Sequence, residues 1–217
     1  PSAVKTTTGE TLFTREQYDS GRQVWQRVGG HEMGSIWGHG SYVAPDWSAD
    51  WLHREATALL ELWAQRDSGK AYADLDAVQQ AGLQARLQQT MRENTYDPAT
   101  GVITVDADRA QAIRQVNDHY MRLFGPDVEL NTLRAQYAIQ QNPIPDVEQR
   151  QSMMAFFFWT SWSASTNRPD NTITYTSNWP SEPLVGNVPT TSTYLWTFIS
   201  IFGLLAGVGA LAWYYVA

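Results

Sequence analysis

The chain has 217 residues, no cysteine and a formal net charge of −7 at pH 7. Without cysteine, disulfides, thiolate-bound zinc, iron–sulfur clusters and covalently attached haem c are excluded. The acidic balance argues against nucleic acid as a partner, because binding to phosphates requires a basic surface. The length suits one sizeable domain with an appendage. Because the sequence starts at Pro1 and stops within apolar residues, we expect it to be part of a longer membrane protein.

The first predicted helix covers residues 14–28, after a polar stretch at 1–13 that we expect to be extended. Thr14 and Gln17 have the spacing of a capping box, in which each side chain bonds the backbone N–H of the other. The glycine pair 29–30 is a common signal for the end of a helix. One apolar face is indicated by four residues at helical spacing: Tyr18, Gly21, Val24 and Trp25.

A second helix is predicted over residues 50–65, with Ser48 or Asp50 as its N-cap and one buried apolar stripe. Residues 66–140 follow as a polar segment of short helices, with one arm of a small hairpin at 102–105. No catalytic spacing occurs in this segment. We therefore interpret it as a structural insertion that lies outside the core.

The third long helix is predicted over residues 147–164 and is apolar on nearly every side. Its apolar run is too short to cross a bilayer, so we expect a helix that is buried on several sides. Residues 168–191 are rich in Pro, Asn, Ser and Thr, which is typical of a linker laid over a surface. The uncharged run 195–217, flanked by Tyr and Trp at both ends, is long enough for a transmembrane helix.

The histidines have no spacing that indicates catalysis. His31-Glu32 lacks the second histidine of the zinc-protease motif H-E-x-x-H. His39 and His53 flank a glycine-rich loop and have the chemistry to bind a metal or to carry protons, but no clear third ligand accompanies them. We favour a structural role for both residues.

The glycine-rich loop carries a longer motif. Residues 38–45 read Gly-His-Gly-Ser-Tyr-Val-Ala-Pro, and they follow Val24-Trp25 near the end of the first helix. Both runs resemble the haem-attachment region in the cytochrome c subunit of nitric oxide reductases. Residues 30–34, however, are Gly-His-Glu-Met-Gly, where a haem-binding C-x-x-C-H would stand. The chain resembles the quinol-dependent nitric oxide reductases, in which this domain is fused to the catalytic subunit and carries no haem.

The resemblance implies a mainly α-helical, cytochrome c-like fold without haem. In cytochrome c folds the first and last helices pack together, so Gly21 and Trp25 would meet the region 156–159. The chain is then divided into a cytochrome c-like core (1–65 and 141–167), a helical insertion with a short hairpin (66–140), a linker over the surface (168–191) and a transmembrane helix (192–217).

The resemblance also implies a function. The parent would be a respiratory enzyme that takes electrons from quinol and reduces two NO to nitrous oxide and water, with haem b, haem b3 and non-haem iron on later membrane helices. This fragment would itself be structural, and its partners would be the catalytic transmembrane region of the same polypeptide and the lipid membrane. Residues 1–191 would lie on the extracytoplasmic side of a bacterial inner membrane, because no basic residue flanks the helix on that side. The alternative is an independent, single-pass anchored scaffold or binding module without enzymatic activity.

The resemblance leads to two hypotheses about sites. In the cytochrome subunit, the Gly-x-Tyr of this loop helps to hold calcium at the interface with the catalytic subunit. The Gly40 carbonyl and the Tyr42 hydroxyl are therefore the predicted metal ligands. A simple turn at Gly40 and a core hydroxyl at Tyr42 fit the sequence equally well. Because Gly34 stands at the position of the haem ligand, we expect large side chains to fill the haem space: Trp37, Trp51 and members of the run 156–162.

Overall fold

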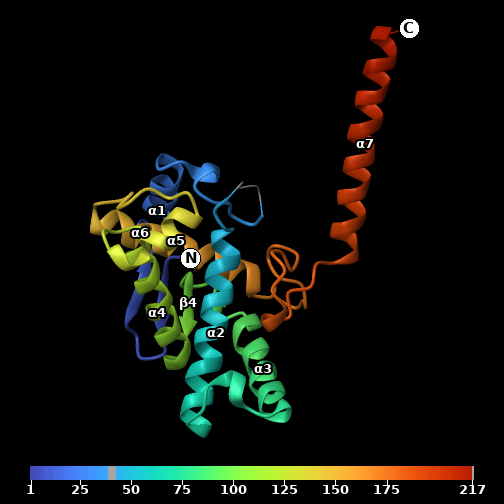
Figure 1. The fold of residues 1–217 in the computed structure, drawn as a ribbon. Coiled ribbons are helices and arrows are strands. Elements are labelled where there is room, and N and C mark those ends of the chain that lie inside the picture. Colours follow the sequence, from blue (N-terminus) through green and yellow to red (C-terminus); the bar gives the residue numbers. More distant parts are fainter. Residues whose placement is uncertain (39–42, 217) are drawn as a thin grey trace.

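A computed structural model describes residues 1–38 and 43–216 and shows a helical domain from which one long helix, α7, projects (Figure 1). Three helices form the centre of the domain: α1 (Arg15–Arg27), α2 (Trp47–Ser68) and α6 (Val147–Ser165). They correspond to the three long helices predicted from the sequence. Thr14 caps α1 with the predicted capping box. The mainly α-helical fold class is confirmed.

Helix α1 lies directly against α6 because Gly21 has no side chain at the contact. A Cβ built on Gly21 would lie 1.9 Å from the Ser152 carbonyl oxygen, so the two backbones approach too closely for any larger residue. One turn further along, Trp25 contacts Phe156, with the ring centroids 5.7 Å apart. The predicted meeting of the first and last core helices is confirmed, with Trp25 against Phe156 as expected, whereas Gly21 meets Ser152, one turn before the predicted region 156–159.

Helix α2 begins at Trp47, three residues earlier than predicted. Its N-cap is Asp46, whose carboxylate accepts a hydrogen bond from the Ala49 backbone N–H at 2.9 Å. Both predicted caps, Ser48 and Asp50, were wrong because their side chains have other partners. The Ser48 hydroxyl donates to Asp46, and Asp50 forms an ion pair within the helix.

Residues 66–140 are not a unit outside the core. Helix α4 (Ala107–Leu123) packs on both α2 and α6, and its residues Ile113 and Tyr120 belong to the same buried cluster as Trp51 and Phe157. The expected placement outside the core was wrong, because α4 is polar on one face only and turns a complete apolar stripe inward. The division of the chain at residues 65 and 141 stays a prediction.

A buried ion pair connects α2 with α4. Glu55 and Arg109 are almost fully buried, and Arg109 Nε donates to one Glu55 carboxylate oxygen at 2.8 Å. Trp51 Nε1 donates to the other oxygen at 2.9 Å. Removal of one partner would leave an uncompensated buried charge, which costs about 3–5 kcal/mol. The core therefore depends on a residue from the segment 66–140.

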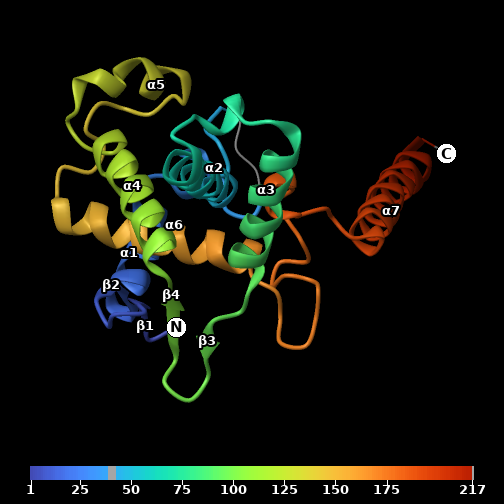
Figure 2. The same cartoon turned by 90° about the horizontal axis from the view of Figure 1, so that it is seen from below.

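A small four-stranded sheet joins the N-terminus to this segment (Figure 2). The predicted hairpin at 102–105 is confirmed as the antiparallel pair β3–β4. Residues 1–13, expected to be simply extended, form a second hairpin whose first strand pairs parallel with β4. In the order β2-β1-β4-β3, the strands are β2 (Thr11–Thr14), β1 (Ala3–Thr6), β4 (Val102–Val105) and β3 (Tyr96–Asp97). Helices α3 (Ala77–Arg92) and α5 (Asn131–Gln136) complete the domain.

After α6 the chain runs over the domain surface, through the short 3-10 turn η4 (Pro183–Val185), to α7 (Thr191–Val216). Asn187 anchors this segment, because its buried side-chain amide donates to the carbonyls of Ala164 at 2.7 Å and Pro180 at 3.1 Å. Helix α7 has 26 residues and contains no buried residue. Within the described part of the chain, it is the one helix that is long and apolar enough to cross a membrane.

Candidate functional site

Asp46 closes the base of the loop that carries the 38–45 motif. The Ser35 backbone N–H donates to the Pro45 carbonyl at 3.2 Å, and the Trp47 N–H donates to the Ser35 carbonyl at 2.9 Å. The Asp46 carboxylate accepts from the Ser35 hydroxyl at 2.8 Å and from the Gly38 backbone N–H. One carboxylate therefore caps helix α2 and also holds the two ends of the loop together.

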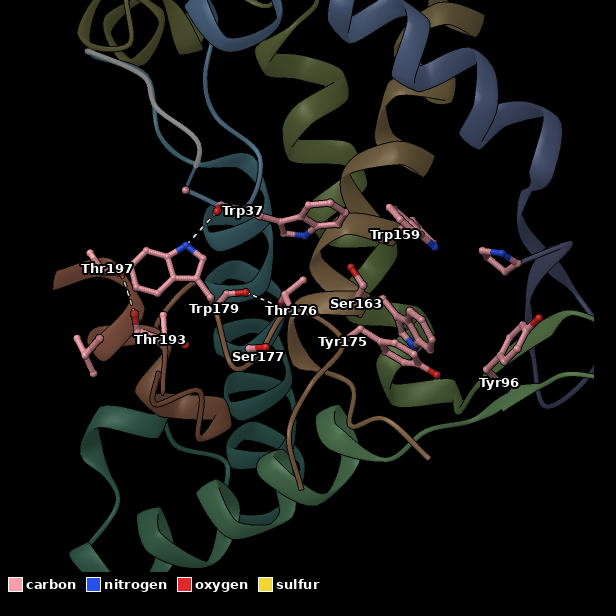
Figure 3. Close-up of a pocket in the computed structure, with 14 residues that line it drawn as sticks. Trp37, Tyr96, Trp159, Ser163, Tyr175, Thr176, Ser177, Trp179, Thr193 and Thr197 are labelled. Atoms are coloured by element: carbon pink, nitrogen blue, oxygen red, sulfur yellow. Dashed lines mark hydrogen bonds between the residues drawn. The ribbon is translucent and has the colours of Figure 1, made fainter. Parts of the chain in front are cut away.

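Trp37 is fixed at the start of this loop by three hydrogen bonds, of which Figure 3 marks the one from Trp179. Its backbone N–H donates to Ser48 Oγ at 3.0 Å, and its indole Nε1 donates to the Thr160 carbonyl at 2.9 Å. Its own carbonyl accepts from Trp179 Nε1 at 2.9 Å. Gly38 follows with a φ of 72°, and a Cβ there would lie 2.4 Å from the same Trp179 nitrogen. Conformation and close contact both require a glycine at this point of the motif.

The predicted calcium ligands Gly40 and Tyr42 lie outside the described residues, as does His39. Among residues 1–38 and 43–216, no three His, Asp or Glu side chains gather as a metal site would require. His53 has a structural contact, since its Nδ1 lies 2.9 Å from Glu182 Oε2 and ties α2 to the segment before α7. The calcium site stays a prediction.

The residues at the position implied for haem do not fit that cofactor. The chain has no cysteine, and Gly34 stands where the resemblance places the axial histidine. A Cβ at Gly34 would lie 2.1 Å from Trp47 Nε1, so the Trp47 indole occupies space that even an alanine would need. Trp47 is fully buried and stacks on Phe157, with centroids 5.5 Å apart and an angle of 11° between the rings. Side chains thus pack this part of the core.

Most of the side chains expected to fill the haem space are buried, while their location in that space stays a prediction. Trp51, Phe157 and Phe158 are fully buried, as expected. Trp37 is only partly buried and borders a surface pocket. Sequence analysis missed Trp47, although it stands four residues before Trp51 and therefore on the same face of α2. That spacing was the signal that would have revealed it.

A pocket of about 860 Å³ lies between the domain and the start of α7 (Figure 3). We call it the aromatic pocket. None of the described side chains that line it is charged. Sequence analysis did not find this pocket, because its residues come from segments that only the tertiary fold brings together. Its aromatic side chains are Trp37, Tyr96, Trp159, Trp162, Tyr175, Trp179 and Tyr194.

Comparison with known proteins places the domain in a family. Residues 1–181 match the family model of the NorB cytochrome c-like domain, which belongs to nitric oxide reductase. No curated protein sequence matches the chain. The matched region contains α1 to α6, the loop closed by Asp46, and the segment that leads toward α7 as far as residue 181. The chain therefore belongs to the family of NorB cytochrome c-like domains of nitric oxide reductase.

Proposed function

We propose that this chain is the extracytoplasmic domain and the adjoining membrane helix of a quinol-dependent nitric oxide reductase. The parent enzyme would convert two NO and one quinol into nitrous oxide, water and one quinone. The quinol supplies the two electrons and two protons that the reduction consumes. The family match supports the assignment of the chain to a nitric oxide reductase. The use of quinol as the electron donor goes beyond that match and is our proposal.

The proposal that quinol is the electron donor rests on the packing of Trp47 against Gly34. A cytochrome c domain passes electrons through its haem, but here the attachment cysteines are missing from the sequence and Trp47 fills the space beside the ligand position. Electrons from a soluble cytochrome would therefore find no haem c in this domain. A reductant dissolved in the membrane avoids that requirement, and quinol is the membrane reductant that delivers two electrons.

The proposed role of the domain itself is structural. Its partners would be the lipid bilayer and the catalytic transmembrane region of the same polypeptide, the region to which haem b, haem b3 and non-haem iron belong. Arg168 is the last basic residue before α7. Because basic residues are enriched on the cytoplasmic side of membrane helices, the missing basic flank supports an extracytoplasmic position for residues 1–191.

We also propose that the Gly40 carbonyl and the Tyr42 hydroxyl bind a calcium ion shared with the catalytic region. Gly38, at the base of their loop, lines the same pocket as the first turns of α7, which supports a loop close to the membrane. Calcium takes about six to eight oxygen ligands, so the catalytic region must supply carboxylates.

The calcium proposal is tested in the intact enzyme with Tyr42→Phe. Calcium content should fall and the haem reduction potentials should shift, while the melting temperature of the domain stays unchanged. Tyr18→Phe, on the partly buried side of α1, is the control and should change none of these quantities. If Tyr42→Phe retains its calcium and its potentials, Tyr42 is an ordinary tyrosine.

The function is tested with the full enzyme in membrane vesicles. NO consumption, measured with an NO electrode, should proceed with a reduced quinol and not with a reduced cytochrome c. The purified enzyme should show haem b and no haem c, even when expressed in a host that matures c-type cytochromes. If NO consumption requires reduced cytochrome c, quinol is not the electron donor. A gene that ends after residue 217 would instead favour the single-pass anchored scaffold.

A further inference from the structure

The aromatic pocket follows one face of α6. Trp159, Trp162 and Ser163 stand at positions i, i+3 and i+4 of this helix, and all three line the pocket. Tyr175 stacks on Trp162, with the ring centroids 5.6 Å apart, and extends the aromatic wall toward Trp179. The pocket volume of about 860 Å³ lies within the range of sites that hold small apolar ligands.

The other wall of the pocket belongs to the membrane helix. Thr193, Tyr194 and Thr197, in the first two turns of α7, line it (Figure 3). Helix α7 has no residue buried by the rest of the described chain, so its surface is left for lipid and for other membrane helices. The pocket is therefore continuous with the surface of the first turns of α7. Tyrosine and tryptophan are the residues that gather where a membrane meets water.

Several polar groups around the pocket are bonded to the protein itself. The Trp37 and Trp179 indoles donate to backbone carbonyls at 2.9 Å, and the Ser163 hydroxyl donates to a carbonyl at 2.9 Å. Thr176 Oγ1 donates to a carbonyl, and so does Thr197 Oγ1 at 2.8 Å. The Nε1 of Trp162 has no protein partner and is buried below the pocket surface. The described lining has no charged side chain, and several of its donors are already engaged, which favours a largely apolar ligand.

The outer wall of the pocket is held in place from the segment 66–140. Arg92, at the end of α3, donates through Nη2 to the Thr172 carbonyl at 2.7 Å and to Asn178 Oδ1 at 3.1 Å. Its Nη1 donates to Asn187 Oδ1 at 3.0 Å. These bonds fix the stretch that contains Tyr175 and Trp179. The pocket is thus formed before any ligand arrives, which lowers the entropic cost of binding.

We propose that the aromatic pocket binds an acyl chain of a phospholipid from the outer leaflet of the membrane. The chain would enter along α7 and lie against the α6 face formed by Trp159 and Trp162. Its headgroup would stay at the level of Tyr194. The bound lipid would seal the domain to the membrane surface beside the transmembrane helix. This inference rests on the proposed extracytoplasmic position of the domain, and not on the reaction that the parent enzyme catalyses.

The first test uses site-specific labelling, because residues 1–217 contain no cysteine and any cysteine elsewhere in the full protein is replaced beforehand. Ser177→Cys in the pocket and Ser20→Cys on the exposed side of α1 are labelled with bimane in the full protein, in phosphatidylcholine vesicles. Nitroxide-labelled phosphatidylcholine should quench the label at 177 and leave the label at 20 unchanged, whereas iodide should do the reverse. Quenching at 177 by iodide would show a water-filled pocket, and quenching there by neither reagent would show that polypeptide covers it. Either outcome overturns the proposal.

A second test measures lipid retained through purification. Tyr175→Glu places a charge in the pocket, and Val78→Glu places the same charge on the exposed surface of α3. Native mass spectrometry in detergent should show a phospholipid on the unmodified protein and on Val78→Glu, and its loss from Tyr175→Glu. Equal phospholipid retention by the two variants would refute the acyl-chain site.

Discussion

Replacement of Gly21 by alanine tests the contact on which the core depends. The added Cβ would lie 1.9 Å from the Ser152 carbonyl oxygen and 2.9 Å from the Met153 backbone nitrogen, and both of these are backbone atoms. An ordinary contact begins at 3.4 Å, so α1 and α6 would have to separate by about 1.5 Å, the difference between 3.4 Å and 1.9 Å. Such overpacking of a core costs about 1–3 kcal/mol.

Gly82→Ala is the matched control. Gly82 is also inside a helix, α3, but a Cβ there would meet nothing within 4 Å. Alanine in place of glycine in a helix interior stabilises by roughly 0.5–1 kcal/mol, and both variants receive this gain. Gly82→Ala should therefore raise the free energy of unfolding. Gly21→Ala should lower it by a net amount of up to about 2 kcal/mol, or about 4–8 °C in Tm for a protein of this size.

The assay is chemical or thermal unfolding of the whole chain in detergent micelles, followed by tryptophan fluorescence. The difference between the two variants removes the effect of helix propensity and leaves the steric cost alone. If Gly21→Ala is as stable as Gly82→Ala, α1 and α6 do not approach as closely as described. The cytochrome c-like packing would then be in error at its central contact.

Three further outcomes are expected. Phe157→Ala should lower the free energy of unfolding by about 3–5 kcal/mol because Phe157 is fully buried, and a loss below about 1 kcal/mol would contradict its place in the core. Arg92→Ala should accelerate amide hydrogen exchange in residues 168–191, whereas Arg86→Ala on the same helix, which stacks on Trp63, should not. Burial, followed by the nearby Arg54 charge, lowers the pKa of His119 from 6.5 to about 4. As the pH falls, His119 is therefore protonated in the unfolded chain at a higher pH than in the folded chain. The protein should lose stability as the pH falls from 6.5 to 4, and the variant His119→Gln should lose less stability over the same range.

The segment 66–140 has a wider role than an insertion requires. Helix α4 supplies Arg109 to the buried pair with Glu55, and α3 supplies Arg92 to the chain that leads to α7. Through these two arginines the segment contacts both the core and the connection to the membrane helix. Deletion of 66–140 should therefore unfold the domain and not merely shorten it, and circular dichroism of the deleted chain would measure this.

Local sequence signals determined the helices at the centre of the domain. Thr14 and Gln17 cap α1 because a capping box needs only a spacing of three residues. The helical segments α6 and α7 were found from apolar runs whose length and charge are properties of the sequence alone. The missing cysteines likewise excluded haem c without any knowledge of the fold. Gly21 was predicted to lie at the contact with the last core helix, and the fold decided the atom that it meets, the carbonyl oxygen of Ser152.

Only the tertiary structure decided which distant segments share a core. The parallel pairing of β1 with β4, the burial of α4 and the position of Trp47 beside Gly34 all join residues that no periodicity relates. Such contacts are selected by the burial of apolar area summed over the whole chain, which a local pattern does not record. The aromatic pocket has the same origin, since its walls come from α6, from the stretch before α7 and from α7 itself.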